Sequence, residues 1–457
     1  MQPASQIQSA IECLGQLFEA WHDGNKLPAD QNFQRFAKSR RYIGSKDRHA
    51  IAARYYHVLR HLAILDNICE RAPNYEAVLP YPSPTTAAVR SARMLMLAAL
   101  ISNHEMHIKE VAGCFDGEKF HPPALNHNEH NWLKQLADRF DEEPVDISTE
   151  FWTKKNIAPW LLEKMQGNFG DDTLNILASL QQEAPVDIRI NTLKTNREEL
   201  QQKLKDDGIE TEITPHSLLG LRLTKRAPIF ANQWFREGYF EMQDEGSQVA
   251  AELVKAKSGM RVIDFCAGAG GKTLAIAAQM KNKGRILAFD TSAKRLKDIP
   301  IRMRRAGVNN AAWHTIASES DSFLKRHKKT ADRVLVDAPC SGTGTWRRNP
   351  DLKWRLRDAD IAELTDLQQR IITSAARLVK QGGRLAYVTC SLLKEENENI
   401  ITDFLEKHPD FKVVCAQKIW NKESTNNPAH DQPMFLYLRP DTDGTDGFFA
   451  AVLERVA

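Results

Sequence analysis

The sequence predicts an α/β protein in which a parallel sheet with helices on both faces follows a long helical region. From Met260 onward, short apolar runs alternate with helical patterns, which is typical of such a sheet. The run Arg261–Phe265 meets a glycine-rich turn and then an alanine-rich helix over Thr273–Met280, the opening unit of a nucleotide-binding sheet. Residues 5–140 instead carry apolar side chains at helical spacing.

The glycine-rich turn over residues 266–273 reads Cys-Ala-Gly-Ala-Gly-Gly-Lys-Thr. It is not a phosphate-binding P-loop, because Cys266 stands where that motif needs its first glycine. It is not the dinucleotide fingerprint either, because Thr273 stands at the third glycine position. Further on, Asp290 ends the run Arg285–Phe289, and an acid there can accept hydrogen bonds from ribose hydroxyls. The pattern predicts a nucleoside-containing cofactor; the alternative is a glycine turn that only joins a strand to a helix.

We expect three domains. Residues 1–145 form a helical domain, in which Ser45 caps the helix after the basic turn Arg40–Arg48. Residues 146–235 form a small α+β subdomain, reached through an acidic, proline-containing linker near Asp141–Glu150. Residues 236–457 form the sheet domain. The expected strands are 185–193, 211–213 and 220–223 in the subdomain and 261–265, 285–289, 311–316, 333–337, 384–388, 412–416 and 447–453 in the sheet domain.

The distribution of charge says more than its total. Lys and Arg number 62 and Asp and Glu 59, a net charge of +3. Between Arg35 and Arg60, however, eight cations face one acid, Asp47, and a tyrosine lies among them. Clustered cations are typical of polyanion binders, so we expect the helical domain to contact an RNA backbone. The alternative is a helical bundle whose cations only keep it soluble.

Seven scattered cysteines without a Cys-x-x-Cys pair argue against a zinc ribbon or a disulfide framework. The N-terminus lacks a signal-peptide pattern, and no apolar run approaches membrane-spanning length. We therefore expect a cytoplasmic protein with reduced thiols, no metal and no membrane partner. Nothing in the sequence suggests an exposed apolar stripe, so we also expect a monomer.

Two cysteines follow predicted strands directly. Val334–Gly344 reads Val-Leu-Val-Asp-Ala-Pro-Cys-Ser-Gly-Thr-Gly, and Tyr387–Ser391 reads Tyr-Val-Thr-Cys-Ser. Ligands of such sheets lie beyond the carboxyl ends of the strands, where Cys340 and Cys390 both fall. Their position beside the cofactor loop indicates thiolate chemistry. For the other cysteines we expect packing roles, Cys266 beneath the loop included.

With these motifs in order, the chain resembles the RNA cytosine-5 methyltransferases of the RsmB/NOP type, which include bacterial ribosomal RNA enzymes. The shared segments are Pro-Val-Asp-Ile-Arg-Ile-Asn-Thr-Leu, Met-Gln-Asp-Glu-Gly-Ser-Gln, the glycine loop, Asp-Ala-Pro-Cys-Ser-Gly-Thr-Gly, Thr-Cys-Ser and Asp-Gly-Phe-Phe-Ala. The helical region resembles NusB-type RNA-binding domains. The resemblance implies a Rossmann-like class I methyltransferase sheet, S-adenosylmethionine as cofactor and RNA, foremost small-subunit (16S) ribosomal RNA, as substrate.

The resemblance also implies residue roles. Cys390 is the nucleophile that adds to carbon 6 of cytosine, Cys340 assists release of the enzyme, Asp337 contacts N3 of the ring, and Lys272 supports the site. The implied cofactor contacts are Cys266, Ala267, Gly268, Ala269, Gly270, Gly271, Lys272, Asp290, Ser318 and Asp337.

The chain departs from the family pattern in its cofactor loop. Gly268-Ala269 replaces the usual Ala-Pro, which loosens the turn. Near Ala317–Ser318, with Glu319 adjacent, the family's usual adenine-contacting acid is replaced, so a weaker cofactor contact through Ser318 is expected. After Cys340, the segment Thr345–Trp354 mixes cations with Trp346 and Trp354, which suits a stacked base or, equally, packing.

Three alternatives stay open at this point. They are an RNA-binding ribosome-assembly factor on a methyltransferase fold, methylation of transfer RNA, and a DNA cytosine methyltransferase. A DNA enzyme would use Cys340 as the nucleophile and would not need Cys390.

Overall fold

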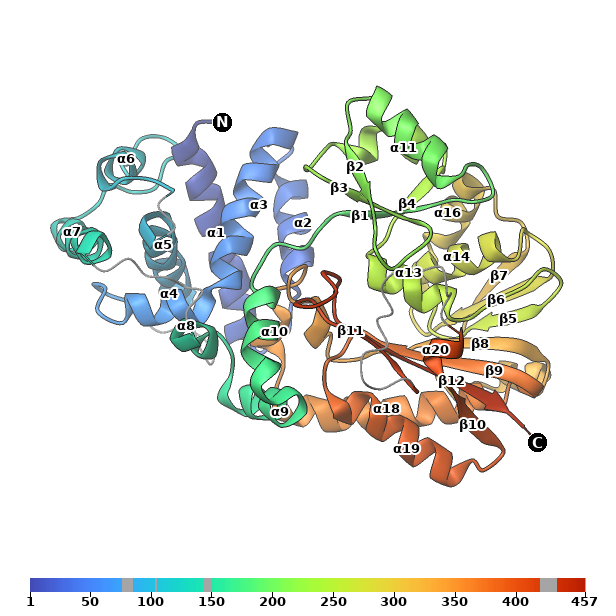
Figure 1. Cartoon of the computed structure of the whole chain (residues 1–457). Helices are drawn as coiled ribbons and strands as arrows, with labels where there is room; N and C mark the ends of the chain where they lie inside the picture. The colour runs from blue at the N-terminus through green and yellow to red at the C-terminus, as the bar shows by residue number, and fades with distance from the viewer. Residues whose placement is uncertain (76–84, 103–104, 143–149, 420–433, 457) are drawn as a thin grey trace. The chain divides into compact units, whose positions relative to one another are not determined.

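The computed structural model describes residues 1–75, 85–102, 105–142, 150–419 and 434–456. These residues form two compact units (Figure 1). One unit holds Met1–Gln182 together with Trp346–Leu356, and the other holds Glu183–Thr345 and Arg357–Ala457. The three-domain division stays a prediction, because the small α+β sheet and the large sheet fall within one compact unit. Most of the linker near Asp141–Glu150 lies outside the described residues.

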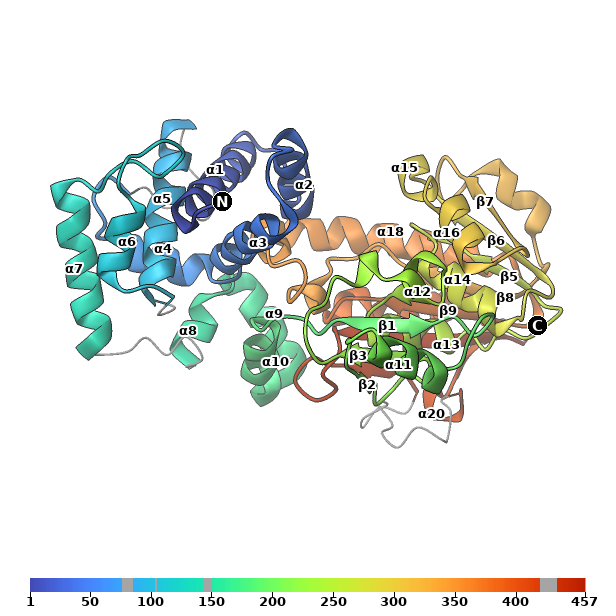
Figure 2. The same ribbon diagram turned by 90° about the horizontal axis from the view of Figure 1, so that it is seen from above.

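The first unit is helical. Helix α1 packs between α5 on one side and α2 and α3 on the other (Figures 1 and 2). Its apolar side chains recur at helical spacing, so that Leu14 and Phe18 are buried against Tyr55 of α3 and Leu95 of α5. The helices are α1 (Pro3–His22), α2 (Ala29–Ser39), α3 (Ser45–Arg60), α4 (Leu62–Cys69), α5 (Thr85–Ser102), α6 (Ile108–Cys114), α7 (His127–Glu142), α8 (Glu150–Lys155), α9 (Pro159–Phe169), α10 (Thr173–Leu180) and α17 (Leu352–Arg355).

The cap expected at Ser45 was wrong. Helix α3 starts at Ser45 itself, and Gly44 in extended conformation is the N-cap residue, without a side-chain cap. The side chain of Arg48 donates to the carbonyl oxygen of Ile43 at 3.0 Å instead. A long side chain thus fixes the turn by a contact that capping preferences do not describe.

The segment Trp346–Leu356 belongs to the helical unit although it follows the Cys340 turn in sequence. The indole nitrogen of Trp354 donates to the carbonyl oxygen of Leu59 at 2.7 Å, and Lys353 Nζ donates to that of Arg60 at 2.8 Å. Trp354 is part of the hydrophobic core of this unit, and Trp346 is buried too. Both indoles are therefore packing residues, and neither offers a free face to a base.

The second unit contains a small antiparallel sheet of order β2-β3-β1-β4. Ile188, Leu221 and Phe240 are buried against Leu200 and Leu204 of α11. The predicted strands are confirmed, and β4 was missed because its three residues were read as an approach to a helix. The elements are β1 (Asp187–Ile190), α11 (Arg197–Asp206), β2 (Thr211–Ile213), β3 (Gly220–Leu223), α12 (Gln233–Arg236) and β4 (Phe240–Met242).

The large sheet has the order β10-β12-β9-β8-β5-β6-β7, with β11 paired to β12. Strands β9, β8, β5, β6 and β7 are mutually parallel, and β10, β11 and β12 pair antiparallel. All predicted strands are confirmed, and β11 was missed. The strands are β5 (Arg261–Asp264), β6 (Arg285–Asp290), β7 (Ala311–Thr315), β8 (Ala331–Asp337), β9 (Val379–Thr389), β10 (Phe411–Val414), β11 (Leu436–Leu438) and β12 (Phe448–Arg455).

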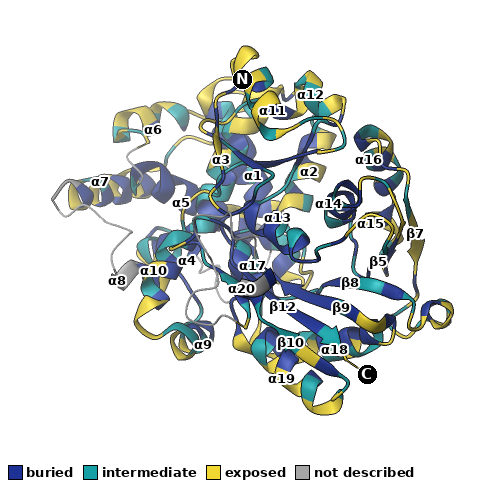
Figure 3. Cartoon of the chain, turned by 45° about the vertical axis from the view of Figure 1, so that its right-hand side comes forward, coloured by how far each residue is buried: buried dark blue, intermediate teal, exposed yellow. Residues whose placement is uncertain are grey.

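Helices cover both faces of this sheet, as a parallel arrangement requires. Helices α13, α14 and α16 lie on one face and α18 and α19 on the other (Figure 1), each over its own apolar core. The central strands are buried and the edge strand β7 is exposed (Figure 3). The helices are α13 (Glu245–Glu252), α14 (Gly271–Gln279), α15 (Ala293–Leu296), α16 (Ile299–Ala306), α18 (Asp358–Ala376), α19 (Glu398–Lys407) and α20 (Ala416–Ile419).

The chain order places a topological switch point at β5. From β5 the chain continues to β6 and β7 on one side, and then returns to β8 and β9 on the other. The loops after β5 and β8 consequently run in opposite directions and leave a crevice at the carboxyl ends of these strands. Among the described helices, none is long and apolar enough to cross a bilayer.

The anchoring of Trp354 gives the first prediction. Trp354→Phe keeps most of the buried ring but removes the hydrogen bond to Leu59, so the free energy of unfolding of the helical unit should fall by about 1–2 kcal/mol. Urea denaturation followed by far-ultraviolet circular dichroism measures it. Trp313→Phe, on the exposed strand β7, is the matched control. Equal midpoints for the two variants would contradict the assigned packing role.

Candidate active site

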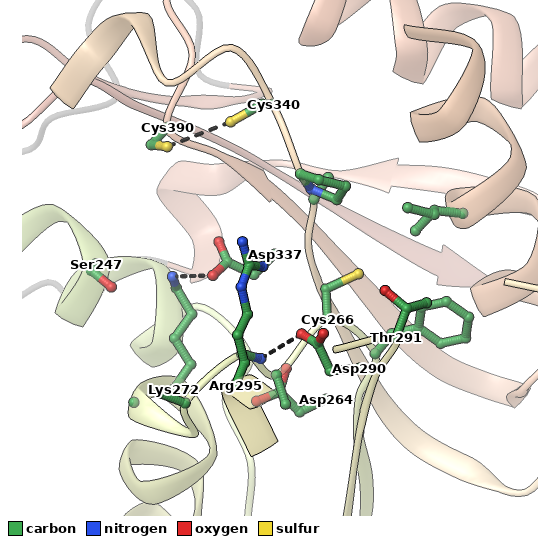
Figure 4. A pocket seen from close by; sticks show the side chains of 18 of the residues that line it. Ser247, Asp264, Cys266, Lys272, Asp290, Thr291, Arg295, Asp337, Cys340 and Cys390 are labelled. Carbon is green, nitrogen blue, oxygen red and sulfur yellow. Dashed lines mark hydrogen bonds and ion pairs between the residues drawn. The ribbon is translucent and has the colours of Figure 1, made fainter. Parts of the chain in front are cut away.

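A cavity of about 500 Å³ opens at the switch point (Figure 4). Its walls come from residues that directly follow four neighbouring strands: Cys266 after β5, Asp290 at the end of β6, Cys340 after β8 and Cys390 after β9. These side chains converge because parallel strands bring their carboxyl ends to one edge. The convergence predicted from the strand ends is confirmed.

The turn between β5 and α14 adopts the conformation that its glycines allow. Gly268 and Gly270 have φ angles of 54° and 82°, in the left-handed region. A Cβ atom on Gly270 would lie 2.9 Å from the side chain of Ile299. The backbone N–H of Gly268 donates to Asp290 Oδ2 at 2.8 Å, so the acid after β6 fixes the turn as well as lining the cavity.

Two arginines donate hydrogen bonds to backbone carbonyl oxygens of the turn. Arg302 of α16 donates to the carbonyl oxygen of Ala269 at 2.7 Å, and Arg189 of β1 donates to that of Gly271 at 2.9 Å. Arg302 also forms an ion pair with the buried Glu241 at 2.9 Å. These two contacts restrain the backbone of the turn.

Lys272 is the central cation of the cavity. Its Nζ lies 2.7 Å from Asp337 Oδ2 (Figure 4). Burial lowers the pKa of Lys272, but the ion pair with Asp337 and the negative charge that Cys390 can carry outweigh this effect and raise the pKa. Lys272 is therefore charged, and the ion pair with Asp337 holds its ammonium group beside that carboxylate.

Asp264 is fully buried at the end of β5, where Thr273 Oγ1 donates to its carboxylate at 2.6 Å. Burial raises the pKa of Asp264 to about 7, against the opposing effect of this hydrogen bond. The residue links β5 to the first turn of α14 and so supports the cofactor turn from below.

The two strand-end cysteines face each other with their Sγ atoms 3.4 Å apart (Figure 4). The interaction with Cys390 and burial raise the pKa of Cys340 well above its ordinary value, which keeps that group a thiol. Burial likewise raises the pKa of Cys266, which packs against the core beneath the loop. Two cysteine side chains thus lie together at the same end of the cavity.

Most of the predicted site residues line this cavity. They are Cys266, Ala267, Gly268, Ala269, Gly271, Lys272, Asp290, Asp337, Cys340 and Cys390. Gly270 lies in the same turn but faces Ile299. Ser318 is not among the lining residues, and its hydroxyl lies 3.0 Å from that of Ser320.

Five further polar side chains line the cavity and were not predicted as site residues: Gln243, Ser247, Thr291, Arg295 and Arg302. Glu319, noted only as the neighbour of Ser318, also lines it, and its carboxylate accepts from Arg370 Nε at 3.0 Å. The Thr291 and Arg295 positions could have been suspected, because they follow the strand end at Asp290. Arg302 gave no local signal, since its contact depends on how α16 packs.

Comparison with known proteins agrees with this geometry. Residues 251–454 match the family model of the 16S rRNA methyltransferase RsmB/F, and residues 158–230 match the ferredoxin-like domain of RsmF/B-like methyltransferases. A probable ribosomal RNA small subunit methyltransferase B of Synechocystis is 34% identical over 325 residues, which cover 70% of this chain and 71% of the relative. The chain belongs to the RsmB/F methyltransferase family.

Solved structures show the same fold. The crystal structure of PH0851 is 28% identical, with a TM-score of 0.76 over 100% of this chain and 99% of that one. A methyltransferase homolog protein from Pyrococcus horikoshii is also 28% identical, with a TM-score of 0.56 over 65% of this chain and 100% of its own.

S-adenosylmethionine is the cofactor, and the residues of the cavity fit it. Asp290 offers a carboxylate to ribose hydroxyls, and the N-terminus of α14 and the turn offer backbone N–H groups. Ile316, Leu367 and Ile371 supply apolar surface for a flat base.

The restraint by Arg302 gives the second prediction. Arg302→Ala frees the carbonyl of Ala269, so the affinity for S-adenosylmethionine should fall about 5- to 10-fold, the equivalent of roughly one hydrogen bond. Isothermal titration calorimetry measures it. Arg304→Ala, which removes the same charge from an exposed position of α16, should bind like the wild type. Equal affinities for both variants would refute the restraint.

The buried carboxyl of Asp264 gives the third prediction. Its folded-state pKa of about 7 lies above the ordinary 3.8, so between these values the folded protein holds a proton that the unfolded chain releases. The free energy of unfolding should therefore fall as pH rises through this window, by up to ~1.4 kcal/mol per pH unit.

Asp264→Asn removes that contribution, so its unfolding free energy should depend less steeply on pH between 5 and 7. Urea denaturation at pH 5, 6 and 7 tests it. Burial also raises the pKa of Glu252 to about 7. Glu252 therefore lowers the unfolding free energy as pH rises over the same range, and part of the pH dependence remains in both proteins. Parallel pH profiles for the two proteins would show that Asp264 does not titrate in this range.

Proposed function

We propose that the protein methylates carbon 5 of a cytosine in RNA, most favourably small-subunit (16S) ribosomal RNA, through a covalent cysteine–cytosine adduct. The observation that supports this most is the pair of cysteines, 3.4 Å apart, at one end of the cofactor cavity. A methyltransferase that acts on an already nucleophilic atom needs no thiol there. Carbon 5 of cytosine is a poor nucleophile, and a thiolate that adds to carbon 6 overcomes this.

In this mechanism Cys390 supplies the thiolate and forms the bond to carbon 6. Lys272, which lines the same cavity and forms the ion pair with Asp337, is proposed to support this step. Asp337, held by Lys272 at 2.7 Å, contacts N3 of the ring and relieves the charge that builds there during addition. When bound, S-adenosylmethionine supplies an electrophilic methyl group, which carbon 5 accepts.

Cys340 acts in the step that releases the product. Solvent accepts the proton of carbon 5, the electron pair left behind restores the double bond between carbons 5 and 6, and Cys390 Sγ leaves carbon 6 as a thiolate. Cys340 assists this elimination from its place beside the Cys390 sulfur. The target base must leave its stack to enter the cavity, because carbon 6 is not accessible to a side chain within a helix of stacked bases.

The RNA is proposed to bind the helical domain, residues 1–145, as well as the subdomain of residues 146–235. Five cations around the basic turn are exposed, and Tyr42 among them is 70% exposed. Such a surface suits phosphates and an unstacked base. These cations are Arg35, Lys38, Arg41, Lys46 and Arg48.

The names of the matching family and of the relative mention small-subunit ribosomal RNA, which favours this RNA over transfer RNA as the substrate. We further propose a monomer that acts in the cytoplasm, where all seven cysteines stay reduced. An RNA-binding assembly factor on the same fold is the second candidate, and the intact set of Cys340, Cys390, Asp337 and Lys272 in one cavity argues against it.

The roles of the two cysteines give the fourth prediction. Purified wild type, Cys340→Ala and Cys390→Ala are incubated with S-adenosylmethionine and unmodified 16S ribosomal RNA, and then separated on a denaturing gel. Cys340→Ala should accumulate an RNA adduct, because release is blocked after the sulfur–carbon bond has formed. Cys390→Ala should form no adduct and lose at least ~1,000-fold in methyl transfer.

The opposite pattern would exchange the roles of the two cysteines and indicate the mechanism of DNA cytosine methyltransferases. If none of the three proteins forms an adduct or methylates ribosomal RNA, the same gel is run with transfer RNA. An adduct or methyl transfer there indicates a transfer RNA substrate, and neither indicates the assembly-factor function.

A further inference from the structure

The carboxylate of Glu396 lies between the two loops that carry the cysteines. It is 0% exposed and comes from the short helix Lys394–Glu396, which follows Cys390 in the chain. Glu396 Oε1 accepts from the backbone N–H of Ser341 at 2.8 Å, and Oε2 accepts from the hydroxyls of both Ser341 and Ser391. Ser341 directly follows Cys340 and Ser391 directly follows Cys390, so one carboxylate joins the two catalytic loops.

Further hydrogen bonds tie the same loops together. Gly344 N–H donates to the carbonyl oxygen of Cys390 at 3.0 Å, and the N–H of Leu392 donates to Thr343 Oγ1 at 2.8 Å. Gln368 of α18 donates from Nε2 to Glu396 Oε1 at 3.0 Å and to the carbonyl oxygen of Pro339 at 2.9 Å. The carboxylate is the centre of this network, because it accepts from both cysteine loops and from α18.

Glu396 does not line the cofactor cavity, and neither do Ser341 and Ser391. Any effect of Glu396 on the reaction must therefore act through the positions of the two cysteines. A buried carboxylate is costly unless hydrogen bonds satisfy it, and here four donors, all neutral, do so. A carboxylate is also the side chain that accepts at every one of its lone pairs, whereas an amide in its place must donate at one end.

We propose that Glu396 is a positioning residue that sets the separation of the Cys340 and Cys390 sulfurs, an inference that rests on the proposed cytosine chemistry. The two sulfurs act on the same base in succession, so each must reach its own atom without the base moving. Misplacement of a reacting group by about 1 Å can cost on the order of 100-fold in rate. The Glu396 network prevents such misplacement by fixing the residue after each cysteine.

The first test of this positioning uses no RNA. A bifunctional thiol reagent that fluoresces only when both arms have reacted is added to the purified full chain, and peptide mapping identifies the Cys340–Cys390 link. Glu396→Gln should form this link several-fold more slowly than the wild type. Glu406→Gln, which removes the same charge from an exposed position of α19, is the control and should react like the wild type.

The second test separates the two loops by their reaction steps, with the adduct gel as readout. Ser341→Ala removes the hydroxyl of the residue that follows Cys340 and so loosens mainly the Cys340 side, and the adduct should accumulate as release slows. Ser391→Ala loosens the Cys390 side, so adduct formation itself should slow. Glu396→Gln should lose about 10- to 100-fold in methyl transfer. All three variants should bind S-adenosylmethionine as tightly as the wild type, because none of these residues lines the cavity.

The proposal falls if Glu396→Gln matches the wild type in both linking rate and methyl transfer. It also falls if activity, cofactor affinity and melting temperature decline together, since that pattern belongs to a general loss of structure. If the wild type itself methylates no RNA, the proposed function fails, and the linking rates of the wild type, Glu396→Gln and Glu406→Gln still decide whether Glu396 sets the distance between the sulfurs.

Discussion

The pairing of β8 with β5 on one side and β9 on the other is the constraint on which the site depends. Asp337 pairs with Val388 in register, so the chains that leave β8 and β9 start from the same level of the sheet. Cys340 and Cys390 then lie three and two residues beyond these partners. A slip of the register would separate the sulfurs and remove Asp337 from Lys272 together. Backbone hydrogen bonds between β8 and β9 thus determine which side chains meet at this edge of the sheet.

Around this edge, three acids take different roles because their surroundings differ. Asp264 has Thr273 as its partner in a fully buried place and stays largely protonated below neutral pH. Asp290 is tied to the backbone of the cofactor turn. Asp337 is 2.7 Å from the buried ammonium of Lys272. The three acids thus have a hydroxyl, a backbone N–H and an ammonium group as their respective partners.

Sequence reasoning succeeded where function follows from position along the chain. The residue after a parallel strand must lie at the sheet edge, so Cys340, Cys390 and Asp290 could be placed without any structure. It failed where a contact joins distant segments. The contacts of Arg302 with the turn and of Glu396 with the cysteine loops leave no periodic pattern in the sequence. The residues next to Trp354 likewise do not show that it packs in the helical unit. Three-residue strands carry little alternation, and of the three in this chain β2 was predicted whereas β4 and β11 were missed.

The chain between Cys340 and α18 passes from one compact unit into the other and back. The chain leaves the cysteine turn at Thr345, contributes Trp346–Leu356 to the helical unit, and returns at Arg357. Within that unit, Asp351 accepts from the N–H of Ala29 at 3.1 Å and Trp354 is held by Leu59. Just before the chain enters the helical unit, the N–H of Gly344 donates to the carbonyl oxygen of Cys390 at 3.0 Å. The chain is therefore held by a hydrogen bond on the cysteine side of this crossing and by a hydrophobic core on the helical side.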